Sequence, residues 1–358
     1  MPKPVKQPRA SVLLRMEKEA HNDTKLKLDR ETRVARATSA ELRALLKSMH
    51  SRNAELEKEI DAYAHSVKSR RAPSKIRPTS GSGTSESVAL VLMSDWHIDE
   101  IVPKETVQGL NEYRPEIAEK RARAFFDHLL RVVDMNRKHT RIDTLVAWCG
   151  GDFITGHIHE EMKETTAMTP LESVDFAAQL LRAGFEFLLE HGGFKRIVVP
   201  CSFGNHGRLT RKPYTTKAAE HNLEWFMYIQ LQRQFASSPE LEFHVTRSRL
   251  HDSVVVFDRR LRFHHGEDLK FQGGQQGVYG RLHKSHQAWN QTNPCYMTCV
   301  GHWHQAIAFQ DLGMQNGSLI GYSAYAQLLQ AQFEPPRQMM CLIEKDYGMV
   351  ASYPIFVD

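Results

Sequence analysis

The chain has 358 residues, of which 41% are hydrophobic and 25% charged, a balance typical of a soluble globular protein of at most two domains. No apolar run approaches the roughly 18 residues of a membrane span, and the basic N-terminus lacks the apolar stretch of a secretory signal. Its five cysteines show no metal-finger spacing, which favours reduced thiols. We therefore expect a cytoplasmic protein with no membrane partner.

The positive charge of the chain lies in its first 80 residues. They hold 19 Lys and Arg against 10 Asp and Glu, a net charge of +9, so the remaining residues carry −4 of the formal +5. A basic arm is attracted to polyanions such as nucleic acid or anionic lipid. A solvated helical face or a solubilising tail is the alternative explanation.

An N-terminal helical arm is predicted over residues 1–71. Residues 11–70 contain neither Gly nor Pro and are rich in Ala, Leu, Glu, Lys and Arg, which favours helix. A heptad seam with one polar position runs through Leu42, Leu46, Met49, Asn53, Leu56, Ile60, Tyr63 and Val67. The seam predicts a homodimer or a higher oligomer, and a lone amphipathic helix packed on the rest of the chain is the alternative.

Residues 72–86, rich in Pro, Ser, Gly and Thr, predict a flexible linker, and residues 87–358 predict one folded domain. Strands are predicted at 87–95, 144–152, 196–206, 241–246, 252–257, 260–264, 295–304 and 340–357. Helices are predicted at 114–139, 171–191 and 216–235. Strands that alternate with helices early and cluster late predict an α/β sandwich with helices outside.

Polar side chains follow the apolar runs of this domain. The runs end at Asp95-Trp96-His97, Gly150-Gly151-Asp152, Gly204-Asn205-His206, His264-His265-Gly266 and Gly301-His302-Trp303-His304. In open α/β sheets, ligands bind at the carboxyl ends of strands. In an extended segment the side chains at i and i+2 point the same way, so Asp95 and His97 are expected to reach one site, as are His302 and His304.

These side chains form a mixed set of carboxylate, imidazole and amide ligands. Such a set suits Mn²⁺, Fe²⁺ or Zn²⁺ better than Ca²⁺ or Mg²⁺, which prefer oxygen ligands alone. The lack of cysteine ligands argues against a structural zinc. Any one of the motifs, taken alone, is more often a helix cap or a turn. All of them together, each at a strand end, predict a metal site.

The motifs D-x-H, GD, GNH, H and GHxH occur in this order over residues 90–305, and they resemble those of the calcineurin-like metallophosphoesterases. The resemblance implies a metallophosphoesterase-type β-sandwich flanked by helices, here with a helical N-terminal extension. It also implies two divalent metal ions, for which Mn²⁺ is expected first and Fe²⁺, Zn²⁺ and Mg²⁺ are alternatives. The organisation is similar to phage- or prophage-encoded nuclease-like members, for which the compartment would be the host cytoplasm.

The resemblance further implies a role for each matching residue. One metal would be held by Asp95, His97, Asp152 and His304. The second would be held by Asp152, Asn205, His265 and His302, where His265 is preferred to His264 because the family places this ligand directly before Gly. His206 would protonate the leaving oxygen. Gly207 stands where many members have an acidic residue that orients this histidine, so either another group orients His206 or His206 serves only as an electrostatic stabiliser.

Physical chemistry supports the two catalytic residues, Asp152 and His206. Two cations about 3.5–4 Å apart need a bridging ligand such as the Asp152 carboxylate, and they lower the pKa of a shared water that attacks phosphorus in line. An imidazole with a pKa near 6.5 is a suitable proton donor.

The segments between the motifs indicate the substrate. Residues 207–217 and 269–291 interleave basic side chains, which contact phosphates, with aromatic rings, which stack on bases. Substrate contacts are expected from Arg208, Arg211, Lys212, Lys270, Arg281 and Lys284, and an ordinary surface loop is the alternative for each segment. Trp96 and Trp303 are expected to pack in the core, whereas Glu267 and Asp268 are either partners of the histidine ligands or plain turn residues.

Together these features favour a metal-dependent phosphodiesterase that hydrolyses DNA, as an endonuclease or a nickase. A phosphatase or small phosphodiester hydrolase of the same superfamily is the alternative. A non-catalytic DNA-binding protein is a third reading, and the intact ligand set argues against it.

Overall fold

The structure is a computed structural model that describes residues 18, 25, 47–48, 51, 54, 74–76, 85–269, 277–309 and 312–358. The predicted N-terminal arm with its heptad seam, Lys270 and most of the predicted linker lie outside the described residues. The chain divides into two units, 1–71 and 72–358. The second unit carries all the motifs.

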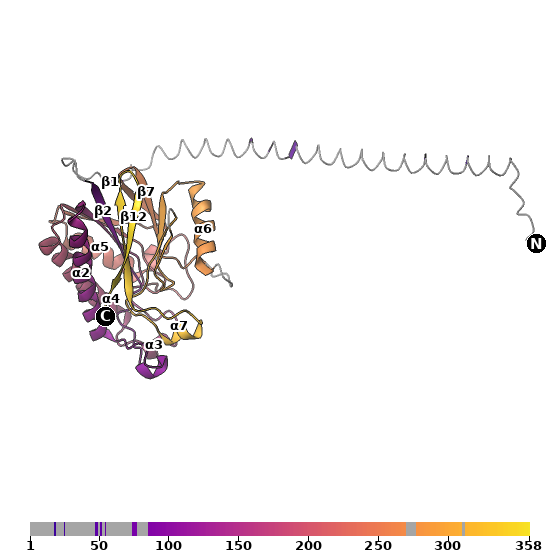
Figure 1. The fold of residues 1–358 in the computed structure, drawn as a ribbon. Coiled ribbons are helices and arrows are strands. Elements are labelled where there is room, and N and C mark those ends of the chain that lie inside the picture. Colours follow the sequence, from indigo (N-terminus) through magenta and orange to yellow (C-terminus); the bar gives the residue numbers. More distant parts are fainter. Residues whose placement is uncertain are drawn as a thin grey trace, which may run out of the picture. The chain divides into compact units, whose positions relative to one another are not determined.

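Two six-stranded mixed sheets build this unit (Figure 1). The first sheet has the order β12-β11-β2-β3-β4-β5, and the second has the order β1-β6-β7-β8-β10-β9. The strands of the first sheet are β2 (Glu86–Met93), β3 (Arg141–Cys149), β4 (Arg196–Cys201), β5 (Leu241–Val245), β11 (Arg337–Glu344) and β12 (Gly348–Phe356). Those of the second are β1 (Ser74–Ile76), β6 (His251–Val256), β7 (Arg259–His264), β8 (Met297–Val300), β9 (Ile307–Phe309) and β10 (Gly313–Gln315).

Eight helical segments are described in this unit. They are η1 (Lys104–Val107), α2 (Pro115–Arg137), α3 (Met162–Thr165), α4 (Pro170–His191), η2 (Ala219–His221), α5 (Leu223–Gln234), α6 (Gly277–Asn290) and α7 (Ala324–Leu328). In the described part of the chain, no helix is long and apolar enough to cross a membrane.

The alternation of side chains along β2 explains the layering. Ala89, Val91 and Met93 pack with residues of α2 and α4 in one core cluster. The intervening side chains of the same strand pack with β6 and β7 in a second cluster. Successive residues of a strand point to opposite faces, so the apolar run of β2 is buried on both sides. Figure 1 shows α2, α4 and α5 on one side of the sandwich and α6 on the other. The predicted α/β sandwich with helices outside is therefore confirmed.

The register of the parallel strands places their ends at one edge. In the first sheet Met93 pairs with Cys149, and Cys149 pairs with Cys201, so β2, β3 and β4 end at the same level. In the second sheet His264 of β7 pairs with Val300 of β8. All the metal-ligand motifs lie in the loops that follow these five strands.

Several elements differ from the sequence prediction, and α6 is one of them, since no helix was predicted over Gly277–Asn290. Ser74–Ile76, placed in the predicted linker, forms a strand parallel to β6. The helix predicted over 216–235 is divided, because Asn222 is extended and caps α5 by accepting hydrogen bonds from the backbone of Glu224 and Trp225. The short strands β9 and β10 were not predicted, and three residues are too few to show a period.

Candidate metal centre

The predicted ligands come together at the strand-end edge of the sandwich. Ligand atoms lie within 4.8 Å of one another in three groups: Asp95, His97 and His304; His97, Asp152 and His206; and Asp152, His265 and His302. The first and third groups correspond to the two metals implied by the sequence. Asp152 shares one group with His97, a predicted ligand of the first metal, and another with His265 and His302, predicted ligands of the second. Its carboxylate therefore lies between the two ligand sets.

The Asp152 carboxylate is buried and surrounded by imidazoles. Its Oδ2 lies 2.8 Å from Nε2 of His265 and 4.0 Å from both Nδ1 of His302 and Nε2 of His206. Burial alone raises the pKa of Asp152, but the charges of His265 and His206 outweigh it and hold this pKa well below its ordinary value. The same pairing raises the pKa of His265 against the opposing effect of its burial.

Asp95 is the second buried carboxylate of the centre. Its Oδ2 accepts a hydrogen bond from the hydroxyl of Ser94, and its Oδ1 accepts one of 2.9 Å from the backbone N–H of His302. The same Oδ1 lies 3.4 Å from Nε2 of His304. Asp95 thus fixes the loop after β8 against the loop after β2, and it faces an imidazole of the other loop.

Most of the predicted ligands have a left-handed backbone. The residues with positive φ include Asp95 (59°), His97 (47°), Asp152 (53°), His302 (70°) and His304 (53°). Such conformations cost of order 1–3 kcal/mol each in non-glycine residues and gather at functional sites. The expectation that extended segments bring these side chains together is wrong: sharp backbone turns aim them at the centre instead.

The amide of Asn205 supplies an independent test of metal binding. Its Oδ1 is buried and has no hydrogen-bond partner, an arrangement that costs about 1–3 kcal/mol for a polar group. A cation would satisfy this oxygen. The complete set of two carboxylates, four imidazoles and one amide oxygen fits a pair of divalent transition metals.

Hydrogen bonds to backbone carbonyls fix the tautomers of two histidines. Nδ1 of His265 donates to the carbonyl of Gly150 at 2.7 Å, so its Nε2 faces Asp152. Nδ1 of His206 donates to the carbonyl of Thr155, also at 2.7 Å. A carbonyl oxygen only accepts, so the second nitrogen of each ring is left for the centre.

Thr155 is a residue that the sequence reasoning missed. Besides holding His206, its hydroxyl lies 3.1 Å from Nδ1 of His97 and donates to Glu100 at 3.2 Å. Its own N–H donates to the Asp99 carboxylate at 2.7 Å. One residue thus positions both a predicted ligand and the predicted acid, and no side-chain pattern in the sequence announces a backbone acceptor.

Glu224 was also missed. This buried carboxylate at the start of α5 accepts hydrogen bonds from the backbone N–H groups of Asp152 (3.2 Å), Phe153 (2.6 Å) and Gly204 (2.8 Å). Burial, with a smaller effect of Asp152, raises its pKa to about 7. Glu224 ties the loops after β3 and β4 together. The available signal was Asn222-x-Glu224, which by itself indicates only a helix start.

Glycines allow these two loops to touch. A Cβ atom on Gly204 would lie 2.1 Å from Oδ1 of Asp152, and one on Gly151 would lie 2.2 Å from the backbone nitrogen of Gly204. Neither distance is sterically allowed, so only glycine permits the approach that brings Asn205 beside Asp152.

The remaining predicted residues have different surroundings. His264 lies 3.6 Å from Asp268 rather than beside Asp152, in keeping with the choice of His265. Glu267 and Asp268 pair with Arg249, and Asp268 also lies beside His264.

The two tryptophans between the ligands were expected to pack in the core. Trp96 is fully buried among Phe125, Phe126 and Phe153, as predicted. Trp303 is partly buried against the small cluster of Leu269, Leu282, Val300 and Leu312.

The predicted substrate-binding residues fall in two places. Arg208, Arg211 and Lys212 lie on the loop after β4, and the latter two are exposed. Arg281 and Lys284 lie on α6, against the second sheet. Among these described residues, Arg208 is the one that lines a pocket together with the predicted ligands Asn205 and His302.

No protein-family model and no curated protein matches the chain. Similar solved structures include wild-type Vps29 with Zn²⁺ from Entamoeba histolytica, at 11% identity over 75% of this chain and 99% of that chain with a TM-score of 0.30. The hypothetical protein PH1004 from Pyrococcus horikoshii is 9% identical over 76% of this chain and 89% of that chain, with a TM-score of 0.32. The sulfate thiohydrolase SoxB from Thermus thermophilus is 10% identical over 77% and 58%, with a TM-score of 0.28. These values are low, so we base the function on the geometry of the centre.

Proposed function

We propose that the protein is a metal-dependent phosphodiesterase of the calcineurin-like metallophosphoesterase type that hydrolyses DNA as an endonuclease or nickase. The observation that carries the proposal is the position of Asp152. Its buried carboxylate lies between two sets of imidazole ligands, with Nε2 of His206 4.0 Å away. This is the arrangement that two metals sharing one ligand require.

Different residues of the chain would bind each of the two metals in such a reaction. Asp95, His97, Asp152 and His304 would hold one metal, and Asp152, Asn205, His265 and His302 the other. When bound, the metals supply a water of lowered pKa and positive charge for the phosphoryl oxygens.

His206 is the proposed donor of the proton that the departing oxygen accepts. Its Nδ1–H is held by the carbonyl of Thr155, so the second proton is carried at Nε2, the atom nearest the centre. Burial lowers the pKa of His206, which makes the protonated ring a stronger acid than free imidazole. Protonated Nε2 is placed to donate to the departing oxygen.

DNA is the preferred substrate because of the charge around the centre. The loop after β4 carries Arg208, Arg211 and Lys212, and Arg208 donates a hydrogen bond to the carbonyl of Asn205. The first 80 residues add a net charge of +9. Basic groups on a loop and on an arm suit a polyanion better than a small phosphate ester. A phosphatase or a small phosphodiester hydrolase would use the same centre without needing them.

The test is digestion of supercoiled plasmid with Mn²⁺ by the full chain, by Asp152→Asn and by residues 72–358. The truncation begins at residue 72 because Ser74–Ile76 belongs to the second sheet. We expect nicked plasmid from the full chain and nearly none from Asp152→Asn. Supercoiled, linear and single-stranded DNA all left intact would exclude the nuclease.

Two further comparisons separate the alternatives. A truncation that cleaves bis(p-nitrophenyl) phosphate normally but DNA poorly would show that the arm binds DNA. Faster hydrolysis of p-nitrophenyl phosphate than of the bis ester would favour the phosphatase instead.

A further inference from the structure

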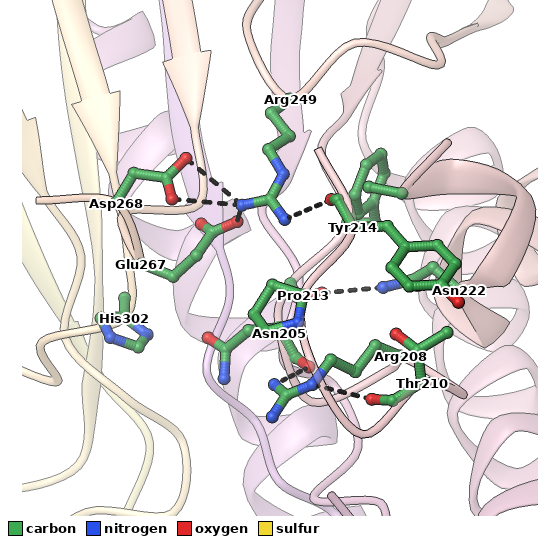
Figure 2. A pocket seen from close by; sticks show the side chains of 13 residues that line it. Asn205, Arg208, Thr210, Pro213, Tyr214, Asn222, Arg249, Glu267, Asp268 and His302 are labelled. Atoms are coloured by element: carbon green, nitrogen blue, oxygen red, sulfur yellow. Dashed lines mark hydrogen bonds and ion pairs between the residues drawn. The ribbon is translucent and has the colours of Figure 1, made fainter. Parts of the chain in front are cut away.

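A pocket of about 240 Å³ adjoins the metal centre. Its lining includes Asn205 and His302, both predicted ligands, so whatever occupies it lies next to the reacting phosphorus (Figure 2). Typical small-molecule sites measure roughly 300–1,000 Å³. The pocket is therefore large enough for about one building block of a polymer and not for an extended ligand.

Arg208 gives the pocket a cation with unused donors. Its Nε donates to the carbonyl of Thr210 at 3.2 Å, and its Nη1 donates to the carbonyl of Asn205 at 2.9 Å. These bonds fix the guanidinium plane and use two of its five N–H groups, so the others can bind an anion. Because the plane is held in advance, a phosphate oxygen is bound at little entropic cost.

The second arginine of the pocket, Arg249, forms part of the pocket wall but does not offer a binding site for an anion. Nη1 of Arg249 lies 2.7 Å from Glu267 and 3.2 Å from Asp268, and its Nη2 donates to the carbonyl of Tyr214 at 3.0 Å. Figure 2 shows it joining the two sides of the pocket. Two carboxylates compensate its charge, so the phosphate-binding capacity rests with Arg208.

Tyr214 gives the pocket a flat apolar face. Its side chain is half exposed, and its ring meets His221 edge-on at a centroid distance of 5.0 Å. Pro213 and Phe203 line the pocket as well. An exposed ring and a pre-positioned guanidinium that line one pocket offer stacking and phosphate binding together, which is the pair of contacts that a nucleotide makes.

We propose that this pocket binds one nucleotide of the substrate, with its base against Tyr214 and a phosphate oxygen on Arg208. The inference rests on the proposed phosphodiesterase function, and it adds the place where a nucleoside is recognised. Stacking of one base changes affinity by about fivefold to 150-fold.

Two substrates with one leaving group test the pocket. Bis(p-nitrophenyl) phosphate carries no nucleoside, whereas the p-nitrophenyl ester of thymidine 5′-monophosphate does. We expect kcat/KM of the full-length protein with Mn²⁺ to be at least fivefold higher for the thymidine ester. Tyr214→Ala should reduce this ratio at least fivefold, Tyr214→Phe should retain it, and Arg208→Met should lower both rates. Arg123→Met on α2, whose side chain is 77% exposed, is the control and should change neither.

A binding readout separates the nucleoside from its phosphate. Thymidine 5′-monophosphate should inhibit hydrolysis of the bis ester at least fivefold more strongly than inorganic phosphate, and Tyr214→Ala should remove this difference. Equal inhibition, or an unchanged ratio in Tyr214→Ala, would overturn the pocket assignment alone. Hydrolysis of neither ester by the wild-type protein would overturn the proposed function, and this inference with it.

Discussion

The backbone carbonyl of Thr155 accepts a hydrogen bond of 2.7 Å from Nδ1 of His206. Because Gly207 has no side chain, it supplies no carboxylate to orient the His206 ring. The neutral carbonyl of Thr155 orients the ring instead, without adding a negative charge beside it. The pKa of His206 is accordingly lowered by burial, even though Asp152 opposes that effect. The ring is held with Nε2 toward the centre, as the proposed proton donation requires, and its lowered pKa means that it carries the second proton weakly.

The loss of activity in His206→Ala should therefore depend on the leaving group of the substrate. Loss of a general acid costs about 10²–10⁴-fold for an alkoxide leaving group, such as the sugar oxygen of DNA. A nitrophenolate leaves without protonation, so bis(p-nitrophenyl) phosphate should be affected far less. The measurement is kcat/KM for both substrates, with bound metal quantified by elemental analysis. Equal losses on both substrates would assign His206 to metal or phosphate binding instead.

The shared carboxylate can be tested without activity. Metal that binds only the native state stabilises it by about 2.7 kcal/mol when the free metal is 100 times Kd. The melting temperature of the wild-type protein should therefore rise with Mn²⁺ concentration. Asp152→Asn should melt cooperatively but lose most of this rise, because both ligand sets use the altered oxygen. Asp175→Asn, on the outer helix α4, is a matched control that should keep it. If the melting temperature of Asp152→Asn rose with Mn²⁺ as much as that of the wild-type protein, Asp152 would not be a metal ligand.

Gly204→Ala should separate the loops after β3 and β4. The added methyl would lie 2.1 Å from Oδ1 of Asp152, so the loops must move apart and the contacts of Glu224 must lengthen. We expect at least a tenfold weaker Mn²⁺ affinity by calorimetry. Gly109→Ala provides the control, since its φ of +77° is strained but no atom lies within 4 Å of the new methyl. It should lower the melting temperature and leave metal affinity unchanged.

The sequence predicted the layers and the motifs because both depend on local patterns. Apolar runs such as that of β2 and the polar residues directly after them, Asp95 and Asp152, are visible in a single stretch of chain. The left-handed backbone of these residues was not visible, since it is imposed by contacts with other loops.

The two missed residues show the same limit. Glu224 acts on a loop 72 residues earlier, so its three hydrogen bonds depend on the finished fold. Thr155 holds His206 through a carbonyl, which every residue type possesses. Which polar side chains gather at this edge could be predicted from the sequence, but the groups that orient them could not.

Metal binding should depend on pH through His265. Asp152 raises the pKa of His265 well above 6.5, although burial opposes it. In the metal-free protein this pair stabilises the fold fully between about pH 3.8 and pH 6.5, and the contribution is lost as pH rises through the raised pKa of His265. A metal ion needs the unprotonated Nε2, so binding near pH 7 must displace this proton.

Mn²⁺ titrations of the metal-free protein at pH 7, in two buffers of different ionisation enthalpy, measure the proton released. We expect about one proton per chain from this pair, and an affinity that falls as the pH is lowered. His265→Gln should release correspondingly fewer protons on binding Mn²⁺. Without metal, its melting temperature should lie below that of the wild-type protein, and this difference should shrink as the pH rises above 6.5. Heats that do not depend on the buffer would mean that His265 is neutral in the metal-free protein.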